Sequence, residues 1–193
     1  MREVLLRAWN IPTQDLLDSY ETNDGRKAAS IGSFTEVSSG KVIPFIKKYQ
    51  TTHAVRFQTG SNFPVYRYAD VLLMLAECLN EAGFVADGEA FQRLNEIRTR
   101  AGLPNKSTTA ADATLLITTQ EQFRDAVAHE RQVELAFENH RWFDLLRTNK
   151  ATTILQAHGA REKTLKAYLN PASYSDIRLL NLYPQRELEL LNR

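Results

Sequence analysis

The chain has 193 residues, of which 43% are hydrophobic, and this is enough to bury one sizeable core. Its 24 basic residues are almost balanced by 23 acidic residues. This balance removes the long-range positive field that a nucleic-acid binder would use, so we expect no nucleic-acid partner. The longest apolar run, Val71 to Ala76, is far shorter than the roughly twenty residues that cross a bilayer.

Residues 1–66 carry frequent turn signals, and we expect them to form a loop-rich flank of the same domain as the rest of the chain. Within this flank, Thr13 to Glu21 predicts one short helix with Thr13 as its N-cap. The segment from Val42 to Tyr49 predicts a strand or an extended crossing segment. The turn signals are Asn10-Ile11-Pro12-Thr13, Asn23-Asp24-Gly25, Ser38-Ser39-Gly40 and Gly60-Ser61-Asn62.

Residues 67–193 have a helical pattern. A first helix is expected to end at Gly83 in a left-handed conformation, and Asp87 is expected to cap a second helix that stops at Ala101 to Pro104. Two helices joined so closely pack antiparallel, as in a tetratricopeptide unit. The apolar positions of the first helix are Val71, Leu72, Met74, Leu75, Cys78 and Leu79.

A long helix is predicted after Thr119, because Thr119 and Gln122 have the spacing of a capping box. The pair Asn139-His140 interrupts the pattern, and a short helix is expected from Arg141 to Arg147. Trp142 gives this short helix a large apolar side chain, which we expect to dock it firmly.

Cys78 is the only cysteine, so the chain has no internal disulfide. It falls within the apolar pattern of the first helix and lacks a nucleophile signature around it. We therefore expect a small buried core residue and not a reactive thiol.

Many charged residues lie on or beside the apolar stripes of these helices, where lone charges would be costly but arginine–carboxylate pairs are tolerated. We interpret them as a structural charge network that sets how the helices pack, and not as catalytic residues. Its predicted members are Arg67, Glu77, Glu130, Arg131, Glu134, Arg141 and Asp144, with Asp70, Arg98 and Glu138 beside them.

Enzyme signatures are missing from the sequence. His129-Glu130 resembles the start of a zinc-protease helix, but Val133 stands where the second histidine would be. The sequence has no Gly-x-Ser-x-Gly elbow and no glycine-rich phosphate loop. We expect no catalytic residue, metal or cofactor. Catalysis by two carboxylates stays open, since only their separation in space is diagnostic.

Three helical segments, in this order and at these distances, resemble the carboxy-terminal part of SusD/RagB proteins. They are RYADVLLMLAECLNEAG at Arg67 to Gly83, LNEIRTRAGLP at Leu94 to Pro104 and ERQVELAFENHRWFDLLR at Glu130 to Arg147. Asn10 to Arg26 and Phe45 to Tyr49 are similar to further family segments. The resemblance implies an all-α fold of tetratricopeptide-like helix pairs with a loop-rich amino-terminal flank.

The resemblance also implies a function. Proteins of this family capture oligosaccharides at the bacterial outer membrane and pass them to a SusC-like TonB-dependent transporter, and they are usually tethered through a lipidated cysteine. This chain shows no signal peptide or anchor, so we expect it to be a carboxy-terminal fragment of a longer lipoprotein or a truncated gene product. A carbohydrate-active hydrolase fragment and a helical protein–protein scaffold are the alternatives.

Sugar rings stack on exposed aromatic side chains, and such residues are therefore the candidates for ligand binding. The flank supplies Trp9, Phe34 and Tyr49 as candidates. No family motif transfers a binding role to any of them, because the ligand-contacting segments of the family would precede this chain.

Overall fold

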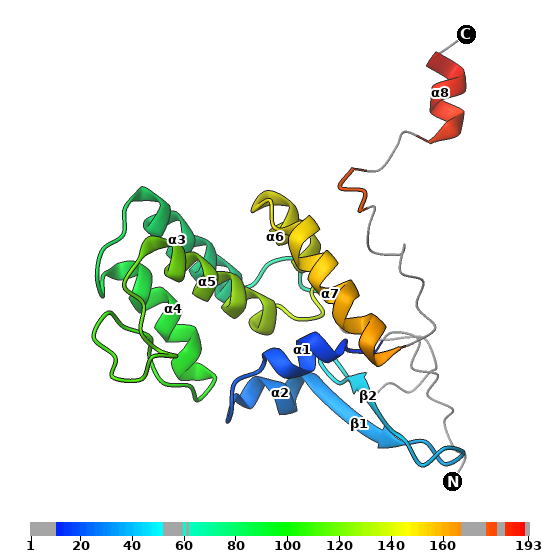
Figure 1. Cartoon of the computed structure of the whole chain (residues 1–193), viewed down its shortest axis with the longest axis horizontal. Coiled ribbons are helices and arrows are strands. Elements are labelled where there is room, and N and C mark those ends of the chain that lie inside the picture. Colours follow the sequence, from blue (N-terminus) through cyan, green and yellow to red (C-terminus); the bar gives the residue numbers. More distant parts are fainter. Residues whose placement is uncertain (1–10, 52–59, 61, 167–176, 181–183, 192–193) are drawn as a thin grey trace. The chain divides into compact units, whose positions relative to one another are not determined.

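The computed structural model describes residues 11–51, 60, 62–166, 177–180 and 184–191, and these residues are mainly helical. By its internal contacts the chain divides into two compact units, Met1–Arg141 and Trp142–Arg193. The first unit holds helices α1 to α5 and a two-stranded sheet (Figure 1). The second unit holds most of α6 together with α7 and α8.

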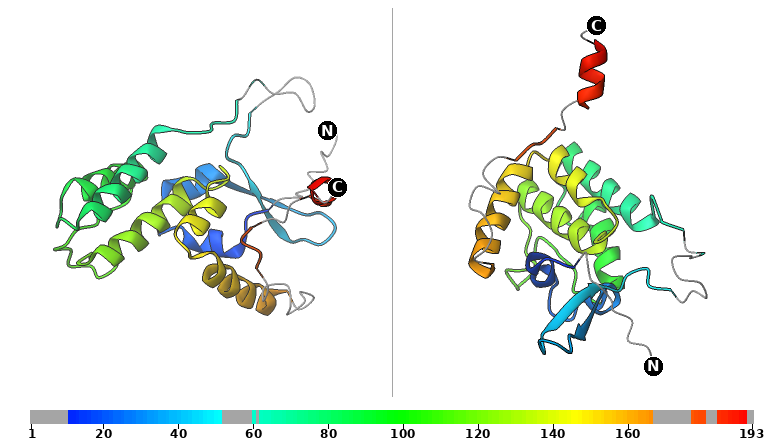
Figure 2. Two further views of the ribbon diagram at one scale, coloured as in Figure 1. Left: turned by 90° about the horizontal axis from the view of Figure 1, so that it is seen from above. Right: turned by 90° about the vertical axis from the view of Figure 1, so that its right-hand side faces the viewer.

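The core of the first unit lies among α3 (Tyr68–Ala82), α4 (Glu89–Arg100) and α5 (Gln120–Glu134). These helices lie side by side in both views of Figure 2. Leu73, Leu94 and Phe123 are completely buried between them, and the rings of Phe91 and Phe123 are 4.8 Å apart. The close pairing of α3 with α4 confirms the predicted tetratricopeptide-like helix pair and the all-α fold class.

The connection between α3 and α4 differs in detail from the prediction. Gly83 does end α3, but its φ of 156° and ψ of 132° lie outside the left-handed helical region, in a part of backbone space that glycine occupies readily. The N-cap of α4 is Gly88 and not Asp87. The Asp87 carboxylate instead accepts hydrogen bonds from the backbone and hydroxyl of Thr108, so it holds the loop after α4.

Helix α3 has apolar residues on two sides, and Cys78 lies on the exposed side. The expectation that Cys78 is a buried core residue is therefore wrong. Leu72, Leu73 and Ala76 face the core, whereas Cys78 is exposed. The residues that share its exposed side of the helix are Val71, Met74 and Leu75. Helices α4 and α5 cover only the first side, so the thiol is not a core residue.

Helix α5 begins as predicted. The Thr119 hydroxyl accepts a hydrogen bond from the backbone of Gln122, and the Gln122 amide oxygen accepts one from the backbone of Thr119. The helix ends at Glu134, and Phe137 and Asn139 then adopt positive φ angles of 69° and 64°. This turn separates α5 from α6 (Arg141–Arg147), as the Asn139-His140 interruption predicts.

The flank contains more regular structure than its turn signals indicate. Helix α1 (Gln14–Ser19) has the predicted N-cap, with the Thr13 hydroxyl accepting from the Leu16 amide at 3.4 Å. A second short helix, α2 (Gly25–Ser30), is capped by Asp24. Strand β2 (Val42–Ile46) falls in the predicted extended segment and pairs antiparallel with β1 (Ile31–Thr35), which the sequence analysis missed.

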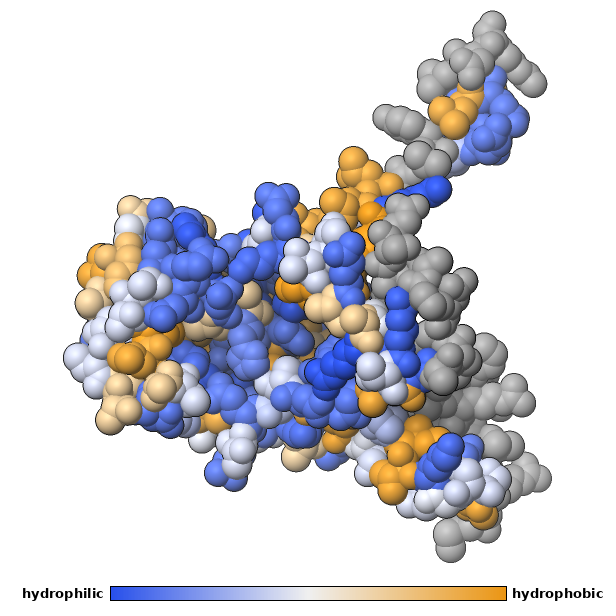
Figure 3. Space-filling model, in the orientation of Figure 1, coloured by the Kyte–Doolittle hydropathy of each residue, from blue (hydrophilic) through white to orange (hydrophobic). Residues whose placement is uncertain are grey.

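The β1–β2 hairpin presents apolar side chains to solvent. Figure 3 shows hydrophobic surface over this part of the first unit, where Val37 and Val42 are exposed. Within the hairpin, Phe34 packs against Phe45 with ring centroids 6.3 Å apart, and Phe45 lies over Gly32, where a Cβ atom would collide with its ring.

In the second unit, α7 spans Ala151–Leu165 and α8 spans Gln185–Leu191. Leu145 of α6 is buried, but Trp142 is 38% exposed and Phe143 is 66% exposed. Trp142 is therefore an exposed residue, contrary to the expectation that its side chain docks α6 firmly. In the described part of the chain, no helix combines the length and the apolar character needed to span a membrane.

Candidate functional site

Three carboxylates follow one another at intervals of four residues along and just beyond the end of α5. Within the helix this spacing places the first two on one side. The turn after the helix brings the third beside them, since Arg67 contacts both the second and the third. They are Glu130, Glu134 and Glu138, and their exposed fractions are only 0%, 4% and 3%. Carboxylates buried to this degree are tolerated only when cations and hydrogen-bond donors surround them.

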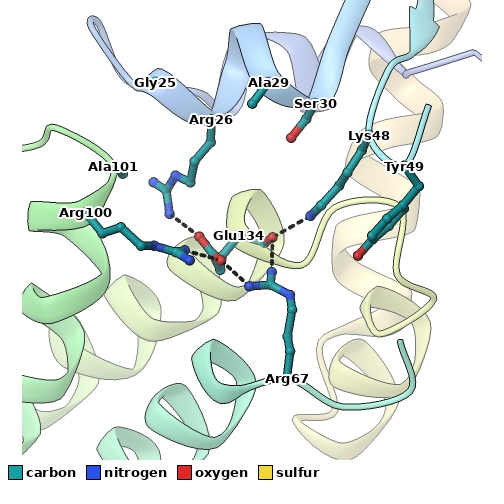
Figure 4. Close-up of a pocket in the computed structure, with 10 residues that line it drawn as sticks. All are labelled: Gly25, Arg26, Ala29, Ser30, Lys48, Tyr49, Arg67, Arg100, Ala101 and Glu134. Carbon is teal, nitrogen blue, oxygen red and sulfur yellow. Dashed lines mark hydrogen bonds and ion pairs between the residues drawn. The ribbon is translucent and has the colours of Figure 1, made fainter. Parts of the chain in front are cut away.

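Glu134 lies at the centre of the resulting cluster (Figure 4). Arg67 donates to its Oε1 from Nη1 at 2.5 Å, and Arg26 donates to its Oε2 from Nη1 at 3.2 Å. Arg100 also donates to Oε1 through Nη2. These three arginines come from the start of α3, from α2 and from the end of α4, so one carboxylate joins three separate elements.

Glu130 is bound on the adjacent side of the cluster. Arg26 and Arg98 both donate to it, and the Arg98 guanidinium also holds Glu21 with N–O distances of 2.6 and 2.9 Å. Arg26 in turn holds both oxygens of Asp24, the N-cap of its own helix, at 2.8 and 2.7 Å. The flank is thereby tied to α4 and α5 through ion pairs.

Glu138 is held from two directions. Arg67 donates to it from Nε at 2.8 Å and from Nη2 at 2.9 Å, and Lys48 donates from Nζ at 2.5 Å. Lys48 also donates to the main-chain oxygens of Glu134 and Ala136, at 2.9 and 3.2 Å. Among the described residues, no buried side-chain nitrogen or oxygen atom lacks a hydrogen-bond partner.

The cluster keeps its carboxylates ionised. Burial by itself would raise the pKa of Glu134, but hydrogen bonds from Arg100 and Arg67 outweigh it and lower the pKa to about 2. The pKa of Glu138 is lowered in the same way, against the effect of burial, by Arg67 and Lys48. Hydrogen bonds from Arg98 lower the pKa of Glu21. None of these three groups is a proton donor near neutral pH.

A cavity of about 510 Å³ opens beside the cluster, within the first unit. Its lining has four cationic side chains and one carboxylate, Glu134, and Figure 4 shows these charges gathered around that carboxylate. Tyr49 lines the cavity as well and is 44% exposed. The cationic residues of the lining are Arg26, Lys48, Arg67 and Arg100.

The three predicted ligand-binding residues have different surroundings. Trp9 lies outside the described residues. Phe34 is partly buried in the hairpin against Phe45 and is not among the cavity-lining residues. Tyr49 is the candidate that lies at the cavity, where it adopts a φ of 65° and lies beneath the Lys48 ammonium at 5.8 Å. Burial and the neighbouring Glu138 carboxylate raise the pKa of Tyr49 to about 12, so its hydroxyl keeps its proton.

The structure brings Arg67, Glu130 and Glu134 of the predicted charge network together. Arg131 forms a buried ion pair with Asp70 at 2.8 Å. Asp144 accepts from Arg147 at 2.9 Å within α6. Glu77 on α3 and Arg141 at the start of α6 are partly buried and take part in polar interactions.

The sequence analysis missed several members of the cluster. Arg26, Lys48 and Arg100 all contact Glu134, yet they lie 108, 86 and 34 residues away from it in sequence. A local signal existed only for Arg100, which follows Arg98 at a spacing of two in the RTRAGLP segment. Ion pairs between residues so far apart in sequence cannot be predicted from the local pattern of a single sequence.

Comparison with known proteins now places the chain in a family. The model of the SusD family matches residues 27–178. The chain belongs to the SusD family. SusD-like protein P38 from Formosa agariphila is 34% identical over 110 residues, which cover 57% of this chain and 22% of the relative.

Two solved structures share the fold. A SusD homologue from Bacteroides thetaiotaomicron has a TM-score of 0.68 at 28% identity, over 91% of this chain and 40% of that one. Surface glycan-binding protein A from Bacteroides uniformis has a TM-score of 0.53 at 28% identity, over 71% of this chain and 29% of that one. This SusD-family chain therefore spans well under half the length of these relatives.

Proposed function

We propose that the chain is part of a glycan-binding component of a bacterial outer-membrane polysaccharide uptake system. In this role it helps to capture oligosaccharides for a SusC-like TonB-dependent transporter and performs no chemistry on them. Membership of the SusD family supports the proposal, as does the likeness to a surface glycan-binding protein. The family also supports a place at the cell surface, with the whole protein held there by a lipid anchor.

The observation that carries the proposal is the exposed ring of Tyr49 at the cavity. A cavity of about 510 Å³ has the size of known small-molecule sites, which measure roughly 300–1,000 Å³. An exposed aromatic ring beside polar donors suits a pyranose, whose carbon face stacks while its hydroxyl groups form hydrogen bonds.

The state of the carboxylates argues against the hydrolase alternative. Glycoside hydrolysis by two carboxyl groups requires one of them to carry a proton at working pH. Here Glu134 and Glu138 are buried, and arginine and lysine lower the pKa of both. A carboxylate whose oxygens already accept from several cations is also poorly placed to attack or protonate a sugar.

Calorimetric titration of the chain with plant, host and fungal oligosaccharides tests the proposal. We expect weak binding of one class, and Tyr49→Ala should weaken it several-fold because a stacking contact contributes roughly 0.5–1.5 kcal/mol. Tyr68→Ala serves as the matched control, since Tyr68 is 68% exposed on α3 and does not line the cavity.

Two results would refute the proposal. One is the absence of binding to every oligosaccharide by the chain and by any longer protein that contains it. The other is release of new reducing ends from a bound oligosaccharide, lost in Glu134→Gln while that variant stays folded. The second result would favour the hydrolase alternative.

A further inference from the structure

The cations that line the cavity differ in how many of their donors are already used. Arg67 donates from Nε, Nη1 and Nη2 to Glu134 and Glu138. Arg26 likewise donates from all three nitrogens. Lys48 has three acceptors for its ammonium group, which has three N–H donors. Lys48 therefore has no N–H left for a ligand, and Arg26 and Arg67 each keep only one, on Nη2 and Nη1 respectively.

Arg100 is different. Its side chain is 58% exposed, and in the part of the chain that the structure describes it donates to Glu134 alone, through Nη2. An arginine guanidinium has five N–H donors, so those on Nε and Nη1 and the second hydrogen on Nη2 stay available, and two neighbouring donors can form a bidentate contact with an anion. Because Glu134 is shared with Arg26 and Arg67, it neutralises the charge of Arg100 only in part.

Tyr49 supplies an aromatic ring to the same cavity. In Figure 4, Arg100 and Tyr49 lie on opposite sides of Glu134 and both belong to the cavity lining. The ring of Tyr49 is accessible, and the hydroxyl remains protonated. A ligand in this cavity can therefore meet an aromatic face at one side and a guanidinium with free donors at the other.

We infer that the cavity binds a sugar unit that carries one anionic group, either the carboxylate of a uronic acid or a sulfate ester. Arg100 pairs with the anionic group while the ring of Tyr49 packs against the sugar. This inference rests on the proposed glycan-binding function and names the class of sugar that the site prefers.

The charge balance of the whole cluster limits the ligand to a single negative charge. Five cations face five carboxylates in the cluster, so it has no net charge with which to attract a polyanion. Only the incompletely neutralised Arg100 favours an anion locally. The cations are Arg26, Lys48, Arg67, Arg98 and Arg100, and the carboxylates are those of Glu21, Asp24, Glu130, Glu134 and Glu138.

Two pairs of probes isolate the charge. The first pair is an aldobiouronic acid with a single glucuronate unit and the methyl ester of the same disaccharide. The second pair is galactose 6-sulfate and galactose. We expect the acid or the sulfate to bind about tenfold or more tightly than its neutral counterpart, since a hydrogen bond to a charged group is worth roughly 1.5–3 kcal/mol. The pair that shows the preference identifies which anionic group the site accepts.

Substitutions test whether Arg100 is the source of the preference for the acidic probe. Arg100→Gln should abolish the preference for the acidic probe, whereas Arg100→Lys should keep part of it because the charge remains and the planar fork is lost. Arg124→Gln is the control, since Arg124 is an exposed, paired arginine of α5 that does not line the cavity. If Arg100→Gln fails to fold, the unaltered chain still provides a test. Its preference for the acidic probe should then shrink as salt is raised.

The results separate this inference from the proposed function. Equal binding of acidic and neutral probes, weakened by Tyr49→Ala but unchanged in Arg100→Gln, would overturn the inference and leave glycan binding in place. An acidic preference that survives Arg100→Gln would also overturn it. Failure of every probe and of the wider oligosaccharide panel would overturn both.

Discussion

Arg67 holds the carboxylate of Glu138 with two nitrogens at once, Nε to Oε2 at 2.8 Å and Nη2 to Oε1 at 2.9 Å, across 71 residues of sequence. The same guanidinium donates from Nη1 to Glu134. One side chain at the start of α3 therefore donates to two buried carboxylates of the cluster, and its loss would leave both with fewer donors.

The first prediction follows from this contact. Arg67→Ala should lower the free energy of unfolding by about 3–5 kcal/mol, because it removes a hydrogen-bonded cation from two buried carboxylates at once. Urea denaturation at neutral pH measures the loss. Arg93→Ala is the control: Arg93 pairs with exposed Glu89 and Glu96 on α4, and such surface pairs contribute about 1 kcal/mol or less. A loss below about 1 kcal/mol for Arg67→Ala would mean that the cluster contributes little to stability.

The second prediction concerns acid. Because the pKa of Glu134 in the folded chain is about 2, below its ordinary value of 4.5, its ionised form stabilises the fold above that ordinary pKa. This stabilisation, on the order of 3 kcal/mol, is lost as the pH falls from about 5 toward 2. Glu138 and Glu21, whose pKa values are also lowered, add to the loss of unfolding free energy as the pH falls.

Unfolding free energies measured at several pH values between 7 and 2.5 test the acid dependence. The unaltered chain should lose stability steeply below about pH 5, whereas Glu134→Gln should start from a lower stability and show a shallower slope. Identical slopes for the two proteins would show that Glu134 has no depressed pKa.

The third prediction concerns the core. Phe123 is completely buried and packs against the tilted ring of Phe91, so Phe123→Ala should cost about 3–5 kcal/mol through lost burial and the cavity it leaves. Phe143→Ala removes the same side chain from a position that is 66% exposed, and it should cost less than about 1 kcal/mol. Chemical denaturation of the two variants compares them directly, and equal losses would contradict the packing described for α3, α4 and α5.

The fourth prediction concerns the start of α5. Thr119→Ala removes the hydroxyl that accepts a hydrogen bond from the backbone N–H of Gln122. It should lower the free energy of unfolding by about 1 kcal/mol. Thr109→Ala, in the exposed loop before the helix, should change stability by less than about 0.5 kcal/mol. Thermal unfolding of both variants would reveal the difference, and a neutral Thr119→Ala would mean that the cap is not formed in solution.

Features that depend only on neighbouring residues were predictable from the sequence. The capping box of Thr119 and Gln122, the end of α4 before Gly102 and the break at Asn139 are all where the pattern predicts them. Each arises from backbone hydrogen bonds or φ preferences within a few residues, so local sequence is sufficient. The order of three helical segments was likewise enough to indicate the SusD family.

Local sequence was not sufficient where two arrangements satisfy the same pattern. Helix α3 has apolar residues on two sides, and periodicity cannot say which side α4 and α5 cover. Leu72 and Leu73 are buried and Cys78 is exposed because α4 and α5 pack against one side of α3 and leave the other side uncovered. The hairpin is a similar case, since β1 becomes a strand through its pairing with β2 and lacks a strong pattern of its own.

Which charged residues pair with one another depends on tertiary packing. Arg26, Arg67 and Arg100 reach Glu134 from 108, 67 and 34 residues away, and any arginine of the chain has the same chemistry. Their selection depends on how α2, α3 and α4 are placed relative to α5, and the burial of Glu134 makes cationic partners necessary. The free donors of Arg100 and the exposed ring of Tyr49 at one cavity are a consequence of that arrangement, which no single segment of the sequence contains.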